Sequence, residues 1–312
     1  LKSLPVIWLL SNPIKMKISV IIASYNSSKT IERCLSSLEK QDNSQDFEVI
    51  VVDSSTDNTA EIVSRKFPSV KLYKFYERKY PGDARNFGVA NSSGEILAFT
   101  DADCIVVADW VKQLIVAHES TQLPVIGGAI TNGNPGSYVG WGYYFCSLSQ
   151  WMPQAQEFER IDIPTGCLSA KRWSFEKYGP FLEGSLCEDT LFNWKLAEAG
   201  YNSLFIPSIQ VAHINIEDLK VFLSRKIQHG KIFAQLRVKE KKFSNFQRIF
   251  YIYMSPLLPL VILYRRTQDV LRSRIYIKQF ILAFPLVLLG TYCWCYGEFL
   301  GYLFNSGASQ NK

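Results

Sequence analysis

The sequence lacks several features that would assign it directly to a common class. Its seven cysteines form no CxxC pair and no Cys/His cluster with zinc-ligand spacing, which excludes a zinc-finger framework and favours reduced thiols in a reducing compartment. No internal repeat or low-complexity segment is visible. With 47% apolar and 20% charged residues in 312, the chain is too apolar for disorder, and a packed core of one large or two small domains is expected.

The first fifteen residues lack a stretch long enough to cross a membrane. The short apolar run from Leu4 to Leu10 is broken by Pro5, and no clean cleavage site follows it. The chain begins with leucine, and Met16 stands two residues before the first convincing strand. We therefore expect the working protein to begin near Met16.

The N-terminal two-thirds of the chain has nearly equal numbers of acidic and basic residues, so the net charge of +6 arises in the C-terminal part. Basic residues outnumber acidic ones between Glu217 and Lys278. Because apolar segments follow directly, this basicity favours an anionic lipid surface over nucleic acid. We expect a membrane partner and no nucleic-acid partner.

From Ile18 to about Ile130, short apolar runs alternate with stretches of helical spacing. The predicted elements are strands at 18–23, 47–52, 70–75 and 96–99 and helices at 30–38, 60–67 and 84–90. This β-α order predicts an α/β fold with a doubly wound, mostly parallel sheet and a ligand at the carboxyl ends of its strands. Polar clusters at 24–28, 53–58 and 101–103 follow strands directly, so they should meet at one rim.

The second half of the chain has weaker patterns. Residues 131–165 are rich in glycine, aromatics and glutamine without a clear period, which indicates a long loop beside the site. A helix is predicted at 191–199 and a short strand at 203–206. Residues 217–242 mix apolar positions with eight Lys/Arg, which predicts a basic amphipathic helix at a membrane interface. The alternative is a solvated charged helix that packs on the domain.

Two apolar segments close the chain. Ile249–Tyr264 runs 16 residues without charge but contains two prolines, and Phe280–Gly297 runs 18 residues. Only the second is long enough to span, given about 20 apolar residues for a bilayer. If both spanned, the basic linker between them would face away from the side of the α/β domain, against the positive-inside tendency. We therefore favour a first segment that dips into the membrane and returns. The expected organisation is an α/β domain at 17–215, an interfacial region at 216–248 and membrane-associated segments at 249–304.

Paired carboxylates follow the fourth predicted strand. In Asp101-Ala102-Asp103 the two alternate side chains can leave the strand end on the same side, where they would suit Mg²⁺ or Mn²⁺ bridging diphosphate oxygens. The alternative is a solvated pair in a loop. Asp53, at the end of the second strand, could bond a base or ribose, or it could simply form a turn and help to cap the next helix.

Two further motifs carry candidate chemistry. Glu188-Asp189 opens a predicted helix, where free amides favour a carboxylate. Ordinary capping would explain it, but Asp189 could also take the proton of an attacking hydroxyl. Arg85, at the start of another helix, could pair with phosphate or buttress the aspartates.

The order of these motifs resembles the family 2 glycosyltransferases, over about residues 17–230. The matching segments are Ser19–Asn26, Ile50–Asp57, Gly82–Gly88, Phe99–Asp103, Thr165–Cys167, Glu188-Asp189 and His213. The resemblance implies a nucleotide-sugar-binding GT-A fold, followed here by a basic amphipathic helix and C-terminal membrane helices.

The resemblance also implies roles for individual residues. Donor contacts would come from Ala23, Tyr25, Asn26, Asp53, Arg85 and Asp101, metal ligands would be Asp103, Asp101 and His213, and catalysis would rest on Asp189 with Glu188 beside it. Basic residues near the diphosphate would be Arg225, Lys226 and His229.

Two departures narrow the expected activity. A single Asp53 follows Val52 where the family often has paired aspartates, which leaves the base of the donor open. The Gln-x-x-Arg-Trp pattern of processive synthases is absent, which indicates transfer of a single sugar. We expect an inverting enzyme that uses Mn²⁺ or Mg²⁺ and a UDP- or GDP-linked sugar, with a lipid-linked or envelope glycan as acceptor, on the cytoplasmic face of a membrane.

The sequence features argue against two other functions. A nucleotidyltransferase would need a glycine-rich, lysine-containing loop after the first strand, and Ser24–Ser28 is not one. A membrane-bound, non-catalytic nucleotide-sugar-binding or scaffold protein would be expected to have lost the acidic pair or the base, and both are present.

Overall fold

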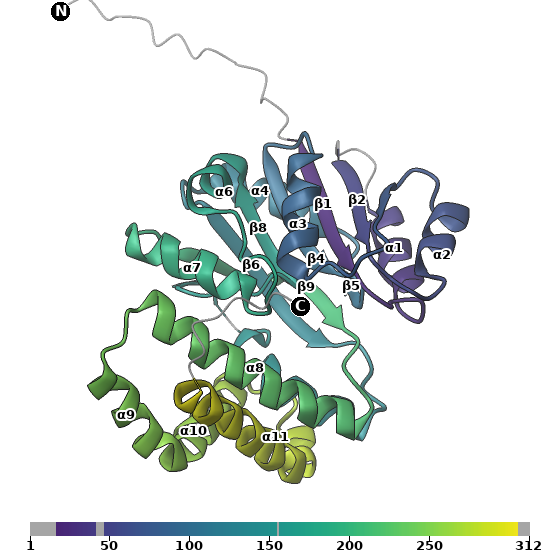
Figure 1. Cartoon of the computed structure of the whole chain (residues 1–312). Coiled ribbons are helices and arrows are strands. Elements are labelled where there is room, and N and C mark those ends of the chain that lie inside the picture. Colours follow the sequence, from purple (N-terminus) through teal and green to yellow (C-terminus); the bar gives the residue numbers. More distant parts are fainter. Residues whose placement is uncertain (1–16, 42–46, 155, 305–312) are drawn as a thin grey trace, which may run out of the picture.

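The computed structural model describes residues 17–41, 47–154 and 156–304, and all structural statements refer to these residues. The expected start near Met16 lies outside them. A sheet with helices on both of its faces forms one part of the molecule, and a layer of helices from the C-terminal part of the chain lies along one end of it (Figure 1).

The sheet has nine strands in the order β3-β2-β1-β4-β8-β6-β9-β5, with β7 paired to β9. The strands are β1 (Ile18–Ser24), β2 (Phe47–Asp53), β3 (Lys71–Lys74), β4 (Ile96–Asp101), β5 (Cys104–Val106), β6 (Val125–Asn132), β7 (Phe158–Arg160), β8 (Cys167–Lys171) and β9 (Ser203–His213). The first four in spatial order are parallel. Strand β8 runs antiparallel to both β4 and β6, so the sheet is mixed but keeps the expected parallel half.

The helices follow the strands in the expected alternation and then dominate the C-terminal part. They are α1 (Ile31–Glu39), α2 (Thr59–Lys66), α3 (Pro81–Ala90), α4 (Trp110–Ser120), α5 (Tyr138–Ser147), α6 (Arg172–Tyr178), α7 (Glu188–Glu198), α8 (Leu219–Glu240), α9 (Asn245–Met254), α10 (Leu258–Ser273) and α11 (Ile277–Leu303), with 3₁₀ turns η1 (Ser149–Trp151) and η2 (Ser255–Leu257).

The core lies on both faces of the sheet because side chains alternate along each strand. Ile18, Val20 and Ile22 of β1 pack on one face with buried residues of α1, α4 and α5. Ile21 points to the other face, into a second cluster with residues of α3, α6 and α7. Both faces are therefore covered, as the unbroken apolar runs of these strands predict.

The register of the parallel half brings the three polar clusters together. Ser24 lies opposite Asp53 in the β1–β2 ladder, and Ala23 lies opposite Asp101 in the β1–β4 ladder. The strands therefore end at the same level, and the prediction that these clusters meet at one rim is confirmed.

The prediction of a long loop at 131–165 is wrong. This stretch holds the end of β6, helix α5, η1 and β7. Helix α5 escaped detection because Trp141, Tyr144 and Phe145 are all buried, so it has no polar face and no amphipathic period. The strand predicted at 203–206 also extends further, to His213.

The C-terminal helices form a layer in which α11 packs along α8 and against α5. The predicted basic amphipathic helix is α8, and the two apolar segments lie in α9–η2–α10 and in α11. Two stretches are long and apolar enough to cross a membrane by length and composition, namely Asn245–Ser273 and Ile277–Leu303. They differ in packing, since 11% of the most apolar window is buried in the first and 44% in the second.

Candidate active site

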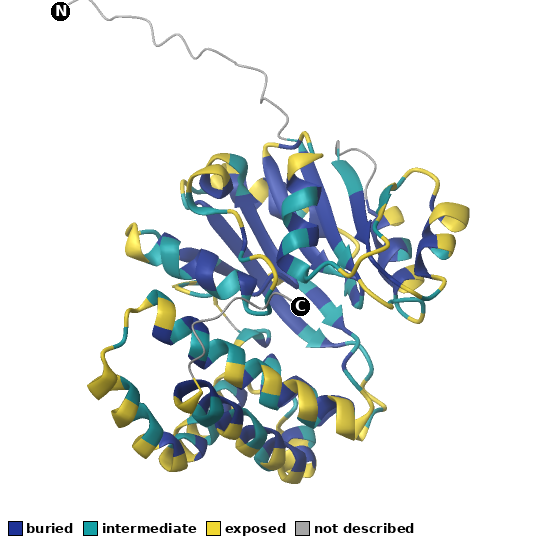
Figure 2. Cartoon of the chain, viewed as in Figure 1, coloured by how far each residue is buried: buried dark blue, intermediate teal, exposed yellow. Residues whose placement is uncertain are grey.

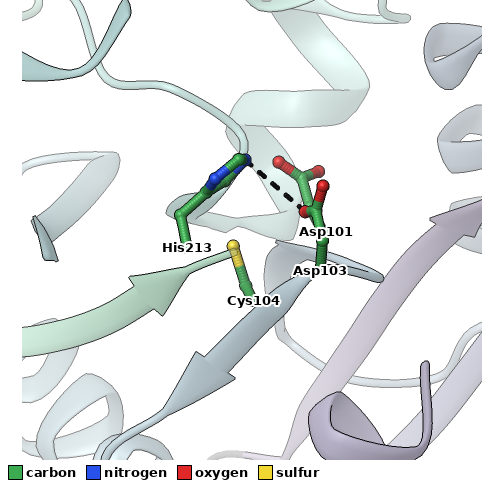
Figure 3. Close-up of side chains that lie close together, drawn as sticks. All are labelled: Asp101, Asp103, Cys104 and His213. Carbon is green, nitrogen blue, oxygen red and sulfur yellow. Dashed lines mark ion pairs between the residues drawn. The ribbon is translucent and has the colours of Figure 1, made fainter. Parts of the chain in front are cut away.

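Four side chains that offer metal-ligating atoms meet at the end of β4, namely Asp101, Asp103, Cys104 and His213 (Figure 3). Their ligand atoms all lie within 4.8 Å of one another. Cys104 pairs with His213 in the antiparallel β5–β9 ladder, and this pairing carries the histidine to the turn that holds the aspartates. The three residues that the sequence suggested as metal ligands are thus brought together, and Cys104 joins them.

Asn215 holds the imidazole of His213 in one orientation. The Nδ1 atom of His213 lies 3.0 Å from Asn215 Oδ1. Asn215 donates its own amide hydrogens to Asn132 Oδ1 at 2.9 Å and to the His213 carbonyl at 3.1 Å, so its amide oxygen accepts the Nδ1 proton. The lone pair is therefore on Nε2, which lies 3.5 Å from Asp103 Oδ1.

This donor set fits a divalent cation. Asp103 Oδ1 is buried and has no hydrogen-bond donor among the described residues, which fits an oxygen that serves as a metal ligand. Two carboxylates with one imidazole nitrogen suit Mn²⁺ or Mg²⁺, which prefer oxygen ligands. Asp101, Asp103 and His213 are the residues that would hold the ion.

Arg85 connects the acidic pair to the motif that opens α7. Its guanidinium forms ion pairs with Asp101 through Nη2 and with Glu188 through Nη1. The side chains of Arg85 and Glu188 are 3% and 9% exposed, so this pair is shielded from solvent screening, whereas Asp101 is 31% exposed. Thr165 adds a hydrogen bond from its hydroxyl to Glu188 Oε1 at 3.3 Å. Arg85 thereby fixes the position of α7 relative to the end of β4.

Asp189 lies at the first turn of α7, directly after Glu188. Its Oδ2 accepts a hydrogen bond from the Thr165 backbone N–H at 3.3 Å. Burial, together with the neighbouring Glu188 carboxylate, raises the pKa of Asp189 to about 7. A carboxylate with a pKa near neutrality is suited to accept a proton and still be ionised at physiological pH.

The residues suggested for the nucleoside lie together at the ends of β1 and β2. Tyr25 is 39% exposed, and the Arg78 guanidinium lies 4.5 Å from the centre of its ring. Asn26 adopts a positive φ of 52° and accepts a hydrogen bond from the Thr56 N–H at 2.9 Å. Asp53 is fully buried and accepts a hydrogen bond from the Ser55 hydroxyl at 2.5 Å, so it supports this loop. Its contact with a nucleotide stays a prediction.

The basic residues of α8 lie beyond the metal-ligand cluster. Lys226 is 3% exposed and donates a hydrogen bond to the Cys146 carbonyl at 3.2 Å. Its ammonium lies 5.4 Å from the ring centres of both Tyr143 and Trp294, and burial lowers its pKa to about 7. Tyr143 in turn stacks on the His213 ring at 6.2 Å, so α5 and α8 both border the site.

Sequence reasoning missed three residues of this site: Cys104, Tyr143 and Asn215. Asn215 follows His213 by two positions, a spacing that could have suggested a partner for the imidazole. Tyr143 gave no signal because it sits in the unrecognised helix α5.

The parallel half of the sheet ends in an acidic pair. Antiparallel strands bring a histidine and a carboxylate-bearing helix to the same edge. This is the GT-A arrangement of glycosyltransferases. The family model described as "Glycosyl transferase family 2" matches residues 19–178, half of the chain. The protein belongs to this family of enzymes.

Individual relatives agree with this assignment. The chain is 26% identical over 202 residues to Glycosyltransferase AglE of Haloferax volcanii, covering 63% of this chain and 66% of that protein. It is 24% identical over 235 residues, 68% of this chain and 71% of the relative, to the "Dolichyl N-acetyl-alpha-D-glucosaminyl phosphate 3-beta-D-2,3-diacetamido-2,3-dideoxy-beta-D-glucuronosyltransferase" of Methanococcus voltae. Two further curated relatives are matched over only 30% and 34% of their lengths.

A solved structure has the same fold. It is the mannosyltransferase PcManGT from Pyrobaculum calidifontis in complex with GDP-Man and Mn²⁺, with a TM-score of 0.61 and 20% identity. The likeness covers 94% of this chain and 89% of that one, so it extends over the catalytic part and the C-terminal helices alike.

Proposed function

We propose that the protein is an inverting glycosyltransferase that moves a single sugar from a UDP- or GDP-linked donor to a lipid-linked or envelope glycan acceptor. The catalytic unit would be residues 17–215, working with Mn²⁺ or Mg²⁺ on the cytoplasmic face of a membrane. Residues 216–248 would form the interfacial region, and residues 249–304 would be membrane-associated.

The observation that carries this proposal is the double ion pair of Arg85 with Asp101 and Glu188. Because Glu188 directly precedes Asp189, this arginine sets the candidate base at a defined position beside the candidate metal ligands. A direct displacement needs this juxtaposition of a base on one side of the sugar and a group that holds the leaving diphosphate on the other.

The proposed reaction is one displacement at the anomeric carbon. The Asp189 carboxylate accepts the proton of the acceptor hydroxyl as its oxygen forms a bond to that carbon. The bond between the carbon and the diphosphate oxygen breaks, and the nucleoside diphosphate leaves with the electron pair. One displacement inverts the anomeric configuration.

A divalent cation held by Asp101, Asp103 and His213 would neutralise negative charge on the leaving diphosphate. The orientation of the His213 ring, set by Asn215, supports this assignment. The PcManGT complex with GDP-Man and Mn²⁺ also supports a metal-assisted use of a nucleotide sugar.

The lipid-linked acceptor and the membrane are supported by two independent observations. The Methanococcus voltae relative is named for a dolichyl phosphate-linked sugar acceptor. The C-terminal helices here are apolar and basic, which suits attachment to an anionic leaflet. The positive charge of these segments favours the cytoplasmic side.

The proposal is tested by measuring nucleotide release and sugar transfer by the purified full-length protein against UDP-, GDP- and dTDP-sugars, with Mn²⁺, with Mg²⁺ and with EDTA. We expect metal-dependent release of one nucleotide, lost in Asp103→Ala. If no donor is turned over or bound, the non-catalytic alternative replaces this proposal.

A further inference from the structure

A stripe of exposed apolar side chains runs along α9, η2 and α10. Six of its members recur every three or four residues, as on one face of a helix: Phe246, Phe250, Tyr253, Leu257, Leu260 and Tyr264. The opposite side of these helices buries Ser255 and Arg266. A helix that packs on its own domain in water shows the reverse pattern, so this stripe is suited to an apolar environment.

The outer face of α11 has the same character. Ile281, Leu289, Tyr292 and Tyr296 are exposed, with exposures between 43% and 66%. Exposed positions occur along the outer side of the helical layer in Figure 2. Large exposed apolar patches on soluble proteins mark interaction sites. Here α9, α10 and α11 all contribute to the patch.

Helix α11 is nevertheless not free to cross a bilayer, because its C-terminal half is tightly packed on α8. A Cβ atom placed on Gly230 of α8 would lie 2.2 Å from the Trp294 carbonyl oxygen, and one on Gly297 would lie 2.1 Å from the Ile227 carbonyl oxygen. The two helix backbones therefore touch. Helix α8 carries exposed cations, including Arg225 and Lys231. If α11 spanned the membrane, these charges would be carried into hydrocarbon with it, which is strongly unfavourable.

The N-terminal half of α11 is held against the catalytic unit by α5. The Tyr138 hydroxyl donates a hydrogen bond to the Leu282 carbonyl at 3.2 Å, and the rings of Phe145 and Phe280 are 5.1 Å apart. A Cβ on Gly142 would lie 2.7 Å from the Leu286 Cβ. One face of α11 is thus occupied by the enzyme along most of its length.

The charge of the same segment is complementary to an anionic leaflet. Residues 241–304 contain eight basic and two acidic residues, a surplus of six that equals the net charge of the whole chain. Neither acidic residue is exposed: Asp269 accepts a hydrogen bond from Ser149 at 3.3 Å, and Glu298 accepts one from Trp294 at 2.6 Å. The exposed charge is positive, and it includes Arg265, Arg272, Arg274 and Lys278.

We propose that α9, α10 and the outer face of α11 form a docking surface on which the enzyme lies in one leaflet of an anionic membrane, without any helix crossing it. Apolar side chains enter the acyl region while the basic residues contact lipid phosphates. This inference refines the membrane attachment of the proposed function and is independent of the donor chemistry. It differs from the sequence-based expectation of a spanning second segment.

The topology is tested by labelling the turn between α10 and α11. A cysteine at Arg274→Cys, in sealed membrane vesicles, is treated with a membrane-impermeant maleimide, and the wild-type protein gives the background from native thiols. The matched control is Tyr76→Cys in the catalytic unit, where the native side chain is 93% exposed. A third cysteine, Phe304→Cys, reports on α11, because it follows that helix directly and its native side chain is 58% exposed. We expect all three cysteines to be labelled from the same side. Labelling of Arg274→Cys or Phe304→Cys from the side opposite to Tyr76→Cys would show that α9–α10 or α11 crosses the bilayer and would overturn the proposal.

The docking surface itself is tested by flotation with vesicles of phosphatidylcholine, with and without phosphatidylglycerol. We expect at least about tenfold stronger binding to the anionic vesicles and loss of that binding in the double variant Tyr253→Glu and Leu260→Glu. Tyr76→Glu is the control and should bind like the wild type. Equal binding to both vesicle types, or unchanged binding of the double variant, would overturn the proposal.

A second copy of the chain is the competing occupant of this surface. It predicts a dimer in detergent-free solution that dissociates in the double variant, with no vesicle binding by the wild type; that result would also overturn the proposal. Donor hydrolysis is measured in the same preparations. Hydrolysis that persists when docking is lost separates a failure of this inference from a failure of the proposed transfer reaction.

Discussion

The sheet-bearing part of the molecule and its C-terminal helical layer follow opposite rules of burial. In the sheet-bearing part, Val20, Ile22 and Phe99 are fully buried, and the buried charged side chains lie at one rim. In the helical layer, Arg266 and Glu298 are at least 92% buried, while large apolar side chains are exposed. The sheet-bearing part has the burial pattern of a protein surrounded by water, whereas the helical layer has the pattern expected beside an apolar phase.

The polar groups inside the helical layer compensate one another. Arg266 donates to the Cys146 carbonyl at 2.7 Å and to the Thr291 hydroxyl, and the Tyr302 hydroxyl donates to Glu298 at 3.0 Å. Hydrogen bonds in a low-dielectric interior are strong. The layer can therefore hold together through its polar interior while its apolar side chains stay exposed at the proposed docking surface.

The largest effect is expected from the rim of the sheet. Asp189→Asn should reduce sugar transfer by roughly 10²–10⁴-fold, because it removes the proton acceptor, while nucleotide-sugar binding remains close to that of the wild type. Steady-state kinetics and calorimetric binding measure the two effects. The control is Asp109→Asn, at an exposed position, which should change neither. A parallel loss of binding in Asp189→Asn would assign this residue to the donor site instead.

The next largest effect is on the free energy of unfolding and concerns Arg85, the buried cation at the rim of the sheet. Arg85→Met leaves Asp101 and Glu188 without their partner and should lower the free energy of unfolding by about 3 kcal/mol. The control is Arg65→Met, whose ion pair with Glu61 is largely exposed and is worth under about 0.5 kcal/mol. Denaturant unfolding measures both. Equal effects would mean that the Arg85 pairs are open to solvent.

The pH dependence of sugar transfer tests the role of Asp189 at the rim of the sheet. Because burial raises the pKa of Asp189 to about 7, the proton-accepting carboxylate is lost as the pH falls below that value. The rate should drop about tenfold per pH unit there and level off above it. A rate profile without an inflection near neutrality would indicate that Asp189 does not titrate in the rate-determining step.

A smaller effect is expected inside the helical layer. Arg266→Met removes the donor to Thr291 and one donor to the Cys146 carbonyl, and should destabilise the protein by about 1–3 kcal/mol. Its neighbour Arg265 is exposed, so Arg265→Met should stay within about 0.5 kcal/mol. The free energy of unfolding in detergent micelles is measured for both variants. If the two variants behave alike, the interior of the layer is not organised by Arg266.

Sequence reasoning succeeded where the local pattern and the tertiary fold agree. The alternation from Ile18 to Phe99 identified the parallel half of the sheet, and Asp101 and Asp103 could be placed because residues after parallel strands share an edge. The family match over 19–178 confirms this reading of the fold. The roles of the individual residues stay predictions.

The rest depended on contacts that no local pattern encodes. Helix α5 was missed because its residues are almost all apolar, aromatic or glycine, so its sequence shows no polar face. Asn215 acts only through the pairing that brings His213 to the aspartates. The ion pair of Arg85 with Glu188 joins residues 103 positions apart. The apolar pattern of Phe280–Gly297 predicts a helix long enough to span, which α11 is by length and composition. Hydropathy does not record that α8 and α5 contact one face of this helix, and whether it spans stays a prediction.

The smallest effect on stability is expected of Leu260→Ala, and it tests the comparison most directly when the same substitution is also made in the sheet-bearing part. Leu114→Ala in α4 removes a side chain that is 1% exposed and should cost about 2–5 kcal/mol. Leu260→Ala in α10 removes one that is 63% exposed and should change the unfolding free energy in micelles by less than about 0.5 kcal/mol, while weakening binding to anionic vesicles. A large loss of stability in Leu260→Ala would mean that this leucine packs against protein, in a second copy of the chain. Stability unchanged and vesicle binding reduced would show that the apolar stripe contributes to attachment and not to folding.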